Sequence, residues 1–383
     1  MVANAGLEHN PAMNNEQMSP VMAQQFELCA NGFAAESAGN LEQAISLYRE
    51  ALELDASNPA PYLYLGYARA NLGELDAAIQ AYSLAADISA NTVNAWRNPD
   101  LPVDMRTRSQ HADNSIRTHF TLLHKQALDE FHQQNPAANI DRVYAAIWCA
   151  THDQAFDYRH EDQRPHLFYV PDLAPVSVFD PSDYGWCADL EAETDKIREE
   201  FIALWQNPAI SGAPYIDDNA TALDANWQPL INSNNWSSLH LYRENERFSQ
   251  VIENAPLTDA ALAKVPLLTT TYGQPRELLF SVLEGQQHIP PHYGLANTDM
   301  TVHLPLIIPE DAAIKVAGVT YPWQEGKLFL FDDAFIHESW NRSTETRVTL
   351  LFAAWHPDLT EDEQEAVAYS FEKREIWNQA RRT

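Results

Sequence analysis

Two histidines and an arginine are the residues of this chain that are best placed to do chemistry together. His292 lies in IPPHYG, after the β-rich run ELLFSVLE, and His337 lies in FDDAFIHES, after KLFLFDD. Histidines on neighbouring strands can bind one metal ion through neutral ring nitrogens. Arg347 follows ten residues later (347 − 337 = 10), where a guanidinium can hold a carboxylate through two hydrogen bonds. The three residues predict a metal site with a carboxylate clamp, although with 14 histidines in the chain the spacing alone is not diagnostic.

The segment that carries these residues is rich in short β-strands. From residue 238 onward, Gly, Pro and Asp turns separate seven runs: SLHLYRE, PLLTTTY, ELLFSVLE, MTVHLPLIIP, AIKVAGVTY, KLFLFDD and RVTLLFAAW. Regularly spaced short strands predict a sandwich or a barrel. A Pro-, Asp- and aromatic-rich stretch over 155–185 marks a boundary before it, and helices are expected over about 187–206 and 360–381.

The N-terminal half contains an internal repeat. Six residues recur after 34 positions (66 − 32 = 34), so that Gly32, Gly39, Leu41, Ala44, Tyr48 and Ala51 match Gly66, Gly73, Leu75, Ala78, Tyr82 and Ala85. The period resembles the tetratricopeptide repeat, a helix–turn–helix unit. A third unit begins at Trp96 but fails at Asn98-Pro99-Asp100, so helices expected over 108–134 and 140–153 must cap the repeats. The repeats can bind a peptide or serve only as a scaffold or dimerisation surface.

Length and charge limit the functional classes. The 383 residues fit two to three domains, and the formal net charge of −30 with only 24 Lys and Arg argues against a nucleic-acid or anionic membrane partner. Three cysteines without paired spacing predict free thiols, and no signal peptide or membrane-spanning run is present. We expect a soluble, cytoplasmic protein; its oligomeric state stays open.

The stretch from LFSVLEGQQHIPPHYG to FAAWHPDLT resembles the aspartyl/asparaginyl β-hydroxylase family across about 275–360, and more weakly back to RPHLFYVPDL near 164. The phrase EGK…FDDxFxHE is present as 325–327, 332–333 and 337–338. In that family a tetratricopeptide region precedes a double-stranded β-helix oxygenase. The resemblance implies an α+β multidomain protein: a helical repeat module followed by a jelly-roll, cupin-like barrel. The predicted domains are a disordered tail at 1–20, repeats at 21–100, capping or linking helices at 101–163, and an oxygenase domain at 164–383 with its barrel core at about 238–360.

The resemblance also implies roles for single residues. His292 and His337 match the iron ligands, Arg347 and Ser281 match the residues that hold the distal carboxylate of 2-oxoglutarate, and His303 matches a histidine near the other end of that molecule. The implied cofactor and cosubstrates are Fe(II), 2-oxoglutarate and dioxygen. The implied reaction is β-hydroxylation of Asp or Asn side chains in a peptide or protein.

Two positions depart from common patterns. Gly294 stands where most such oxygenases have a carboxylate ligand, and Glu338, adjacent to His337 on a strand, would point to the opposite face. Gly at this place resembles the branch that acts on protein side chains and argues against lipid- and free-amino-acid-hydroxylating relatives, but halogenases share it. Thr301 stands where the family commonly has an arginine that contacts the ketoacid, so another residue substitutes, or affinity, substrate or activity has changed.

Two alternatives remain open at this point. One is a hydroxylase or halogenase of a small metabolite such as a small acid. The other is a non-catalytic binding protein that works through its repeats. Three aromatic residues, Trp236, Tyr242 and Tyr293, can line a pocket, with core packing as the favoured role.

Overall fold

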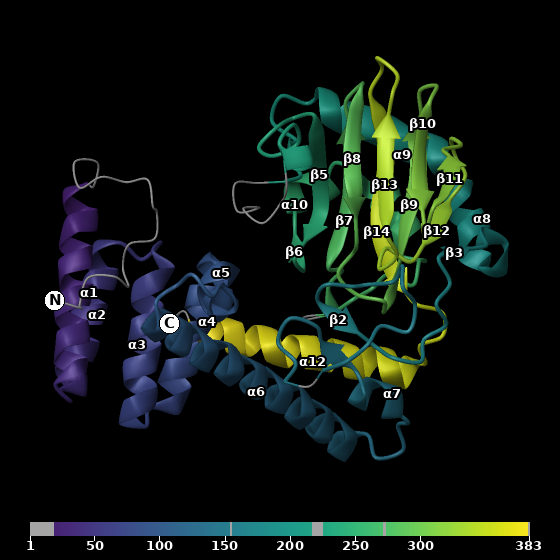
Figure 1. The fold of residues 1–383 in the computed structure, drawn as a ribbon. Helices are drawn as coiled ribbons and strands as arrows, with labels where there is room; N and C mark the ends of the chain where they lie inside the picture. Colours follow the sequence, from purple (N-terminus) through teal and green to yellow (C-terminus); the bar gives the residue numbers. More distant parts are fainter. Residues whose placement is uncertain (1–18, 154, 217–224, 271–272, 382–383) are drawn as a thin grey trace. The chain divides into compact units, whose positions relative to one another are not determined.

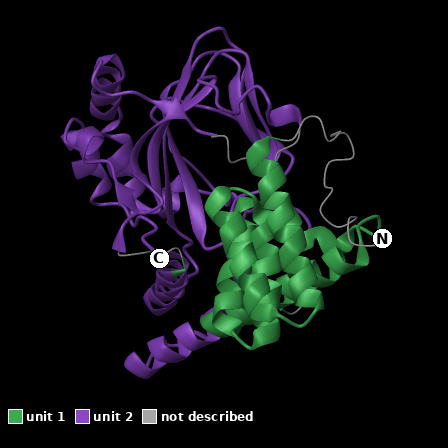
Figure 2. Ribbon diagram, turned by 90° about the vertical axis from the view of Figure 1, so that its left-hand side faces the viewer, with its two compact units in different colours: residues 1–123, 151–154, 381–383 green, residues 124–150, 155–380 purple. Residues whose placement is uncertain are grey.

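The computed structural model describes residues 19–153, 155–216, 225–270 and 273–381, so most of the predicted tail at 1–20 lies outside the described residues. The chain divides into two compact units, drawn in two colours in Figure 2. The first holds the chain up to 123 with 151–153 and 381, and the second holds 124–150 and 155–380. The helices predicted over 101–163 are thus shared between the units, and the predicted domain boundaries stay a prediction. No helix in the described ranges is long and apolar enough to cross a bilayer.

Paired helices form the first unit, and the 34-residue repeat explains how they pack. The elements are α1 (Pro20–Ser37), α2 (Leu41–Leu54), α3 (Pro59–Leu72), α4 (Leu75–Ile88), α5 (Ala90–Asn94), η1 (Ala95–Arg97) and the first part of α6 (Val103–Gln134). A Cβ atom at Gly32 would lie 2.5 Å from the ring of Tyr48, and one at Gly66 would lie 2.5 Å from the ring of Tyr82. Both tyrosines are fully buried. The repeated glycine therefore lets the repeated aromatic ring pack against the preceding helix.

The third repeat stops where the sequence predicts. After the five-residue α5, a 3-10 turn ends at Arg97 and α6 begins at Val103. The predicted helix over 140–153 is wrong for most of its length. Only α7 (Asp141–Tyr144) is helical, and Ile147–Trp148 form β1, which pairs with β2 (Phe168–Tyr169). Pairing with a distant strand overrides the helical pattern here.

Two antiparallel sheets form the core of the second unit (Figure 1). The large sheet has the order β3-β12-β9-β14-β7-β5-β4 with β6 beside β5, and the small sheet has the order β11-β10-β13-β8. Large-sheet bounds are β3 (Val178–Phe179), β4 (Ala213–Pro214), β5 (Trp236–Arg243), β6 (Glu246–Arg247), β7 (Glu277–Leu283), β9 (Asp299–Ile307), β12 (Phe329–Phe331) and β14 (Arg347–Trp355). Small-sheet bounds are β8 (Gln287–His292), β10 (Ala312–Val316), β11 (Val319–Pro322) and β13 (His337–Asn341). This is the predicted jelly-roll-like β domain, which follows the helical region in the sequence.

Alternation along the strands separates an apolar face of the large sheet from a polar one. On β9, Met300, Val302 and Leu304 belong to the main hydrophobic core. That core includes residues of α8 (Gly185–Glu191), α9 (Thr194–Gln206) and α11 (Pro256–Leu262). Because successive side chains of a strand point to opposite faces, His303 and its neighbours at 299 and 301 face the other way. Phe331 of β12 lies with its ring 5.1 Å from that of His337 on the small sheet, so this second face looks into the space between the sheets.

Two strands of the small sheet, β8 and β13, were missed by the sequence prediction, and the strand predicted over 266–272 is not formed in its described residues. β8 contains Pro290 and Pro291, which are unusual inside a sheet, but β8 is an edge strand, where a missing N–H is tolerated. β13 begins at His337 itself. In the predicted run PLLTTTY, 271–272 lie outside the described residues, and the rest makes only isolated bridges such as Leu267 with Ala354.

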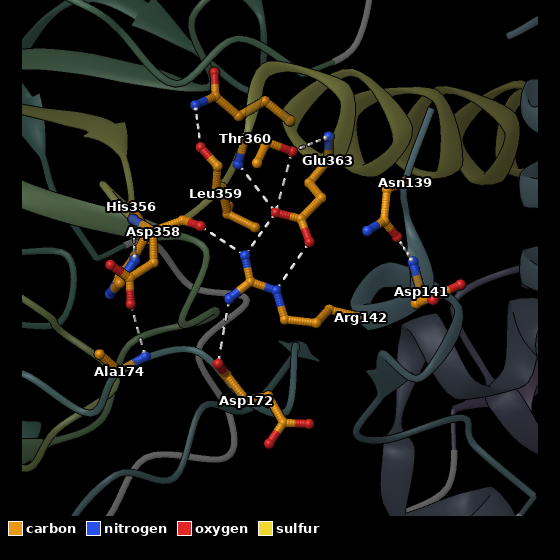
Figure 3. Close-up of polar contacts among 11 residues, drawn as sticks. Asn139, Asp141, Arg142, Asp172, Ala174, His356, Asp358, Leu359, Thr360 and Glu363 are labelled. Atoms are coloured by element: carbon orange, nitrogen blue, oxygen red, sulfur yellow. Dashed lines mark hydrogen bonds and ion pairs between the residues drawn. The ribbon is translucent and has the colours of Figure 1, made fainter. Parts of the chain in front are cut away.

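An arginine attaches the last helix to the second unit. α12 (Glu361–Ala380) begins with a capping box, in which the backbone N–H of Thr360 donates to the Glu363 carboxylate and that of Glu363 donates to the Thr360 hydroxyl. Arg142 donates to both carboxylate oxygens of Glu363, at 2.8 and 2.6 Å, and to the backbone carbonyls of Asp172 and Asp358 (Figure 3). Because four of the five N–H donors of Arg142 are engaged within the chain, we interpret this contact as structural.

Candidate active site

The two predicted metal ligands lie side by side on the small sheet. The strands β8 and β13 lie side by side (Figure 1). His292 ends β8, His337 begins β13, and the two residues are direct partners in the antiparallel ladder. Their ring centroids are 4.0 Å apart at an interplanar angle of 52°. The Nδ1 of His292 donates to the Pro290 carbonyl at 2.8 Å, and that of His337 donates to the Phe335 carbonyl at 2.9 Å. Since Nδ1 carries the proton in both rings, both Nε2 atoms keep a lone pair for a metal ion.

The surroundings keep both imidazoles neutral. Burial lowers the pKa of His292 to about 3, with a further contribution from His337, and burial lowers the pKa of His337 to about 4. The Trp227 ring lies edge-on to His292 at 5.2 Å, and Phe331 lies edge-on to His337 at 5.1 Å. Two neutral nitrogen donors in an aromatic frame fit Fe(II), among other transition metals.

Among the residues that the structure describes, Arg347 is a buried cation without a carboxylate partner. Only 1% of the residue is exposed, its Nε has no hydrogen-bond partner there, and its guanidinium donates one hydrogen bond within this part of the chain, to the Thr349 hydroxyl at 3.0 Å. Burial lowers its pKa to about 10. Carrying a guanidinium into a protein interior is costly unless an anion neutralises it. The site therefore fits the distal carboxylate of 2-oxoglutarate.

Ser281 and His303 lie close to that cation. Ser281 pairs with Thr349 across the β7–β14 ladder, and its Oγ accepts a hydrogen bond from the Trp236 indole at 3.1 Å, which leaves the Ser281 hydroxyl proton for a ligand. The Thr349 hydroxyl contacts the Nδ1 of His303 at 3.3 Å. Burial, followed by the charge of Arg347 and by His337, holds the pKa of His303 well below its usual value. His303 is therefore neutral beside Arg347.

Within the described part of the chain, no third protein ligand accompanies the two histidines, because it contains no group of three or more His, Cys, Asp or Glu side chains that could hold a metal ion. A Cβ atom at Gly294 would collide with the Asp333 carboxylate, whose three outer atoms lie within 2.5 Å of that position. The predicted outward orientation of Glu338 is confirmed, because it pairs with Lys315 at 3.0 Å and His288 at 2.8 Å.

Sequence reasoning missed a charged cluster beside this site. Asp299 and Thr301 share the inner face of β9 with His303, and the Arg276 guanidinium lies 4.0 Å from Asp299. Burial raises the pKa of Asp299 to about 7 and that of Asp333 to about 6, and Arg276 opposes both shifts. The Thr301 side chain also lowers the pKa of Asp333. Alternation from His303 was a usable signal for Asp299, but nothing in the sequence pointed to Arg276.

The three aromatic candidates have different surroundings. Trp236 stacks on Tyr215 at 4.1 Å on the polar side of β5 and bonds Ser281, so it belongs to the site. Tyr242 packs against the main hydrophobic core, as the packing interpretation expects. Tyr293 contacts the ring of His166 edge-on at 5.8 Å.

Comparison with known proteins supports the same reading. Residues 191–357 match the family described as aspartyl/asparaginyl beta-hydroxylase, and residues 37–73 and 61–92 match tetratricopeptide repeats. The ornithine lipid ester-linked acyl 2-hydroxylase of Rhizobium tropici is 34% identical over 183 residues, which are 46% of this chain and 60% of that protein. The human aspartyl/asparaginyl beta-hydroxylase is 32% identical over 205 residues, 52% of this chain and 25% of that protein.

The shared region is therefore less than two thirds of either relative, and their names, one for a lipid and one for a protein side chain, differ in substrate. A solved 2OG-Fe(II) oxygenase family protein from Burkholderia pseudomallei covers 48% of this chain and 96% of its own length, with 12% identity and a TM-score of 0.28, which is too low to support an argument. Residues 191–357 of this chain thus match the aspartyl/asparaginyl β-hydroxylase family, and residues that match tetratricopeptide repeats precede them.

Proposed function

We propose that this protein is an Fe(II)- and 2-oxoglutarate-dependent hydroxylase that acts on Asp or Asn side chains of a peptide or protein. The proposal rests on two observations in the same β domain. Two neutral histidines are fixed by hydrogen bonds from Nδ1 to backbone carbonyls, and a buried arginine lacks an anionic partner among the described residues. Two nitrogen ligands and a carboxylate clamp are what a metal-bound ketoacid requires. When bound, Fe(II) with 2-oxoglutarate and dioxygen supplies the oxidation, in which the ketoacid becomes succinate and carbon dioxide and one oxygen atom enters a C–H bond.

The chain's own residues bind and orient. His292 and His337 hold the metal through Nε2, and the carbonyls of Pro290 and Phe335 fix the orientation of their rings. Arg347 neutralises the distal carboxylate of the ketoacid, and the Ser281 hydroxyl donates to it. Trp227 shields His292 from water on one side. No side chain has to remove a proton from the substrate, because the reactive chemistry belongs to the metal and the ketoacid.

Hydroxylation is favoured over halogenation by the charge beside Gly294. The Asp333 carboxylate lies against the Gly294 backbone, beside the space that a missing carboxylate ligand would leave. A halide in that space would meet a carboxylate in a buried setting, where like charges repel strongly. A water molecule would instead find a hydrogen-bond acceptor.

A non-catalytic role in binding is disfavoured by Arg347. A barrel that served only as a scaffold would gain stability by replacing a buried, uncompensated guanidinium with an apolar side chain. Keeping this residue makes sense when an anion occupies the site during the working cycle.

The proposal is tested by offering Asp- and Asn-containing peptides, together with small acids, to the Fe(II)- and 2-oxoglutarate-loaded protein in the presence of chloride. Mass spectrometry with isotopically labelled dioxygen identifies the product. We expect a product that gains one oxygen atom from dioxygen and no chlorine. A chlorinated product, or succinate stimulated only by a small acid, would move the assignment to one of the alternatives.

A further inference from the structure

The metal site lies between two regions of opposite charge. Arg347 begins β14, and Trp355, at the other end of the strand, pairs with Asp299 of β9. Eight residues of strand (355 − 347 = 8) separate these ends by roughly 26 Å of backbone. His303 pairs with Leu351 midway along β14, and Phe331, which contacts His337, pairs with Thr301. A ketoacid anchored on Arg347 therefore reaches the metal from one end, which leaves the Asp299 end for the substrate.

Carboxylate oxygens without partners face that second end. Asp299 is 1% exposed, and its Oδ2 has no hydrogen-bond partner, only the Arg276 guanidinium at 4.0 Å. The Oδ1 of Asp333 has no hydrogen-bond partner either. A buried acceptor that lacks a donor is costly, so a donor supplied by a ligand stabilises both.

An independent group points into the same region. His240, on the inner side of β5, is 6% exposed, and its Nε2 has no hydrogen-bond partner and lies 3.7 Å from the Glu277 carboxylate. The inner wall thus offers unfilled polar positions for a substrate.

When its carboxyl groups are ionised, this wall carries more negative than positive charge. Glu277, Asp299 and Asp333 face one cation, Arg276, whose charge is shared among all three carboxylates. The Tyr215 hydroxyl donates to Glu277 at 3.4 Å and stays neutral, because burial raises its pKa well above the usual value, so it offsets none of the negative charge. A substrate carboxylate placed here would face an excess of like charge.

We propose that the substrate presents N–H donors and no negative charge at this wall, as the carboxamide of asparagine does, and that aspartate is rejected. This inference rests on the proposed hydroxylase function and narrows its substrate class. The carboxamide has two N–H donors for Asp299 and Asp333. An ammonium group also presents N–H donors and no negative charge, so the test distinguishes a carboxamide from an ammonium group.

The test uses three peptides that differ at one residue: Asn, Asp, or 2,4-diaminobutyrate, which places an ammonium at a comparable distance. Calorimetry measures peptide binding to the full chain with 2-oxoglutarate and Mn(II) in place of Fe(II), at about pH 8, so that carboxyl groups are ionised and no turnover occurs. Succinate release with Fe(II) is measured in parallel. We expect the Asn peptide, or the ammonium peptide if the donor is cationic, to bind about 10-fold or more tightly than the Asp peptide.

The variant Asp299→Asn should reduce that preference to within about 3-fold, with thermal unfolding as the check that it folds. Tighter binding of the Asp peptide than of the Asn peptide to the unaltered chain would overturn the inference. If the Arg276→Gln variant then lost binding of the Asp peptide alone, Arg276 would be the residue that binds the aspartate. The unaltered chain decides the question even where Asp299→Asn does not fold. Absence of succinate under every condition would defeat the proposed function, while the binding data would still judge the substrate class.

Discussion

At the scale of single residues, the clearest prediction concerns Arg347. Replacing it with Gln removes a charge-assisted contact to the ketoacid, worth about 1.5–3 kcal/mol, so the Kd for 2-oxoglutarate should rise roughly 10- to 100-fold. Without ketoacid, the free energy of unfolding should stay the same or rise, because an uncompensated buried charge is lost. Calorimetric titration and urea unfolding measure the two effects.

A matched control is Arg342→Gln. This guanidinium is 62% exposed, lies 3.7 Å from Asp311, and should change neither quantity by more than about 0.5 kcal/mol. Unchanged ketoacid affinity in Arg347→Gln together with a large loss of stability would make Arg347 a structural residue.

The sequence anticipated one side of the site and not the other. His292, His337 and Arg347 were named from their types and spacing, and the family resemblance added Ser281 and His303. The structure places all five in the same β domain, and their roles stay predictions. The charged cluster of Arg276, Glu277, Asp299 and Asp333 was not predicted, because its members come from segments far apart in sequence. The carboxylate oxygens without a hydrogen-bond partner and the close approach of Asp333 to Gly294 depend on packing, which residue types alone do not reveal.

At the scale of elements, the packing of the repeated glycine against the repeated tyrosine ring gives a stability prediction. Gly66→Ala would place a Cβ 2.5 Å from the buried ring of Tyr82, so the free energy of unfolding should fall by about 1–3 kcal/mol. The control is Gly185→Ala at the start of α8, where a Cβ meets nothing within 4 Å and stability should rise by about 0.4–1 kcal/mol. Equal effects of the two substitutions in thermal unfolding would contradict the claim that Gly66 is needed for the close packing of Tyr82.

The α12 anchor gives a prediction on pH. Burial raises the pKa of Glu363, but hydrogen bonds from Arg142 and Thr360 outweigh it and leave the pKa below the ordinary value. The contact therefore contributes fully above about pH 4.3, the pKa of an unfolded Glu, and is lost as pH falls through the lower folded value. Glu363→Gln should cost about 1–3 kcal/mol at pH 7 and progressively less in acid. A penalty independent of pH in urea unfolding would contradict this account.

Element prediction worked where local pattern and tertiary setting agreed. The long α6 and the strands β7, β9 and β14 carry clear periodic patterns. β8 was missed because its two prolines argue against a strand unless one knows that it lies at a sheet edge. The helix predicted over 140–153 failed because β1 finds a partner 20 residues away (168 − 148 = 20).

At the scale of the whole molecule, the sequence foresaw a helical part followed by a β part, and the division into two units shows how they are bounded. The break within α6 was not foreseeable, since the helix is continuous while its two halves pack into different units. Up to 123 it packs with the repeats, and from 124 onward with α12, as in the hydrogen bond between His124 and Ser370 at 2.7 Å.

The central claim is that the His292–His337 pair makes this chain a 2-oxoglutarate oxygenase. Its most direct test is succinate formation by the full chain with Fe(II), 2-oxoglutarate and dioxygen, run beside His292→Ala and His288→Ala. We predict slow succinate release without added substrate, abolished in His292→Ala together with iron binding and retained in His288→Ala, whose half-exposed ring faces Glu338. Succinate release that survives in His292→Ala, or a chain that binds neither iron nor 2-oxoglutarate, would contradict the account.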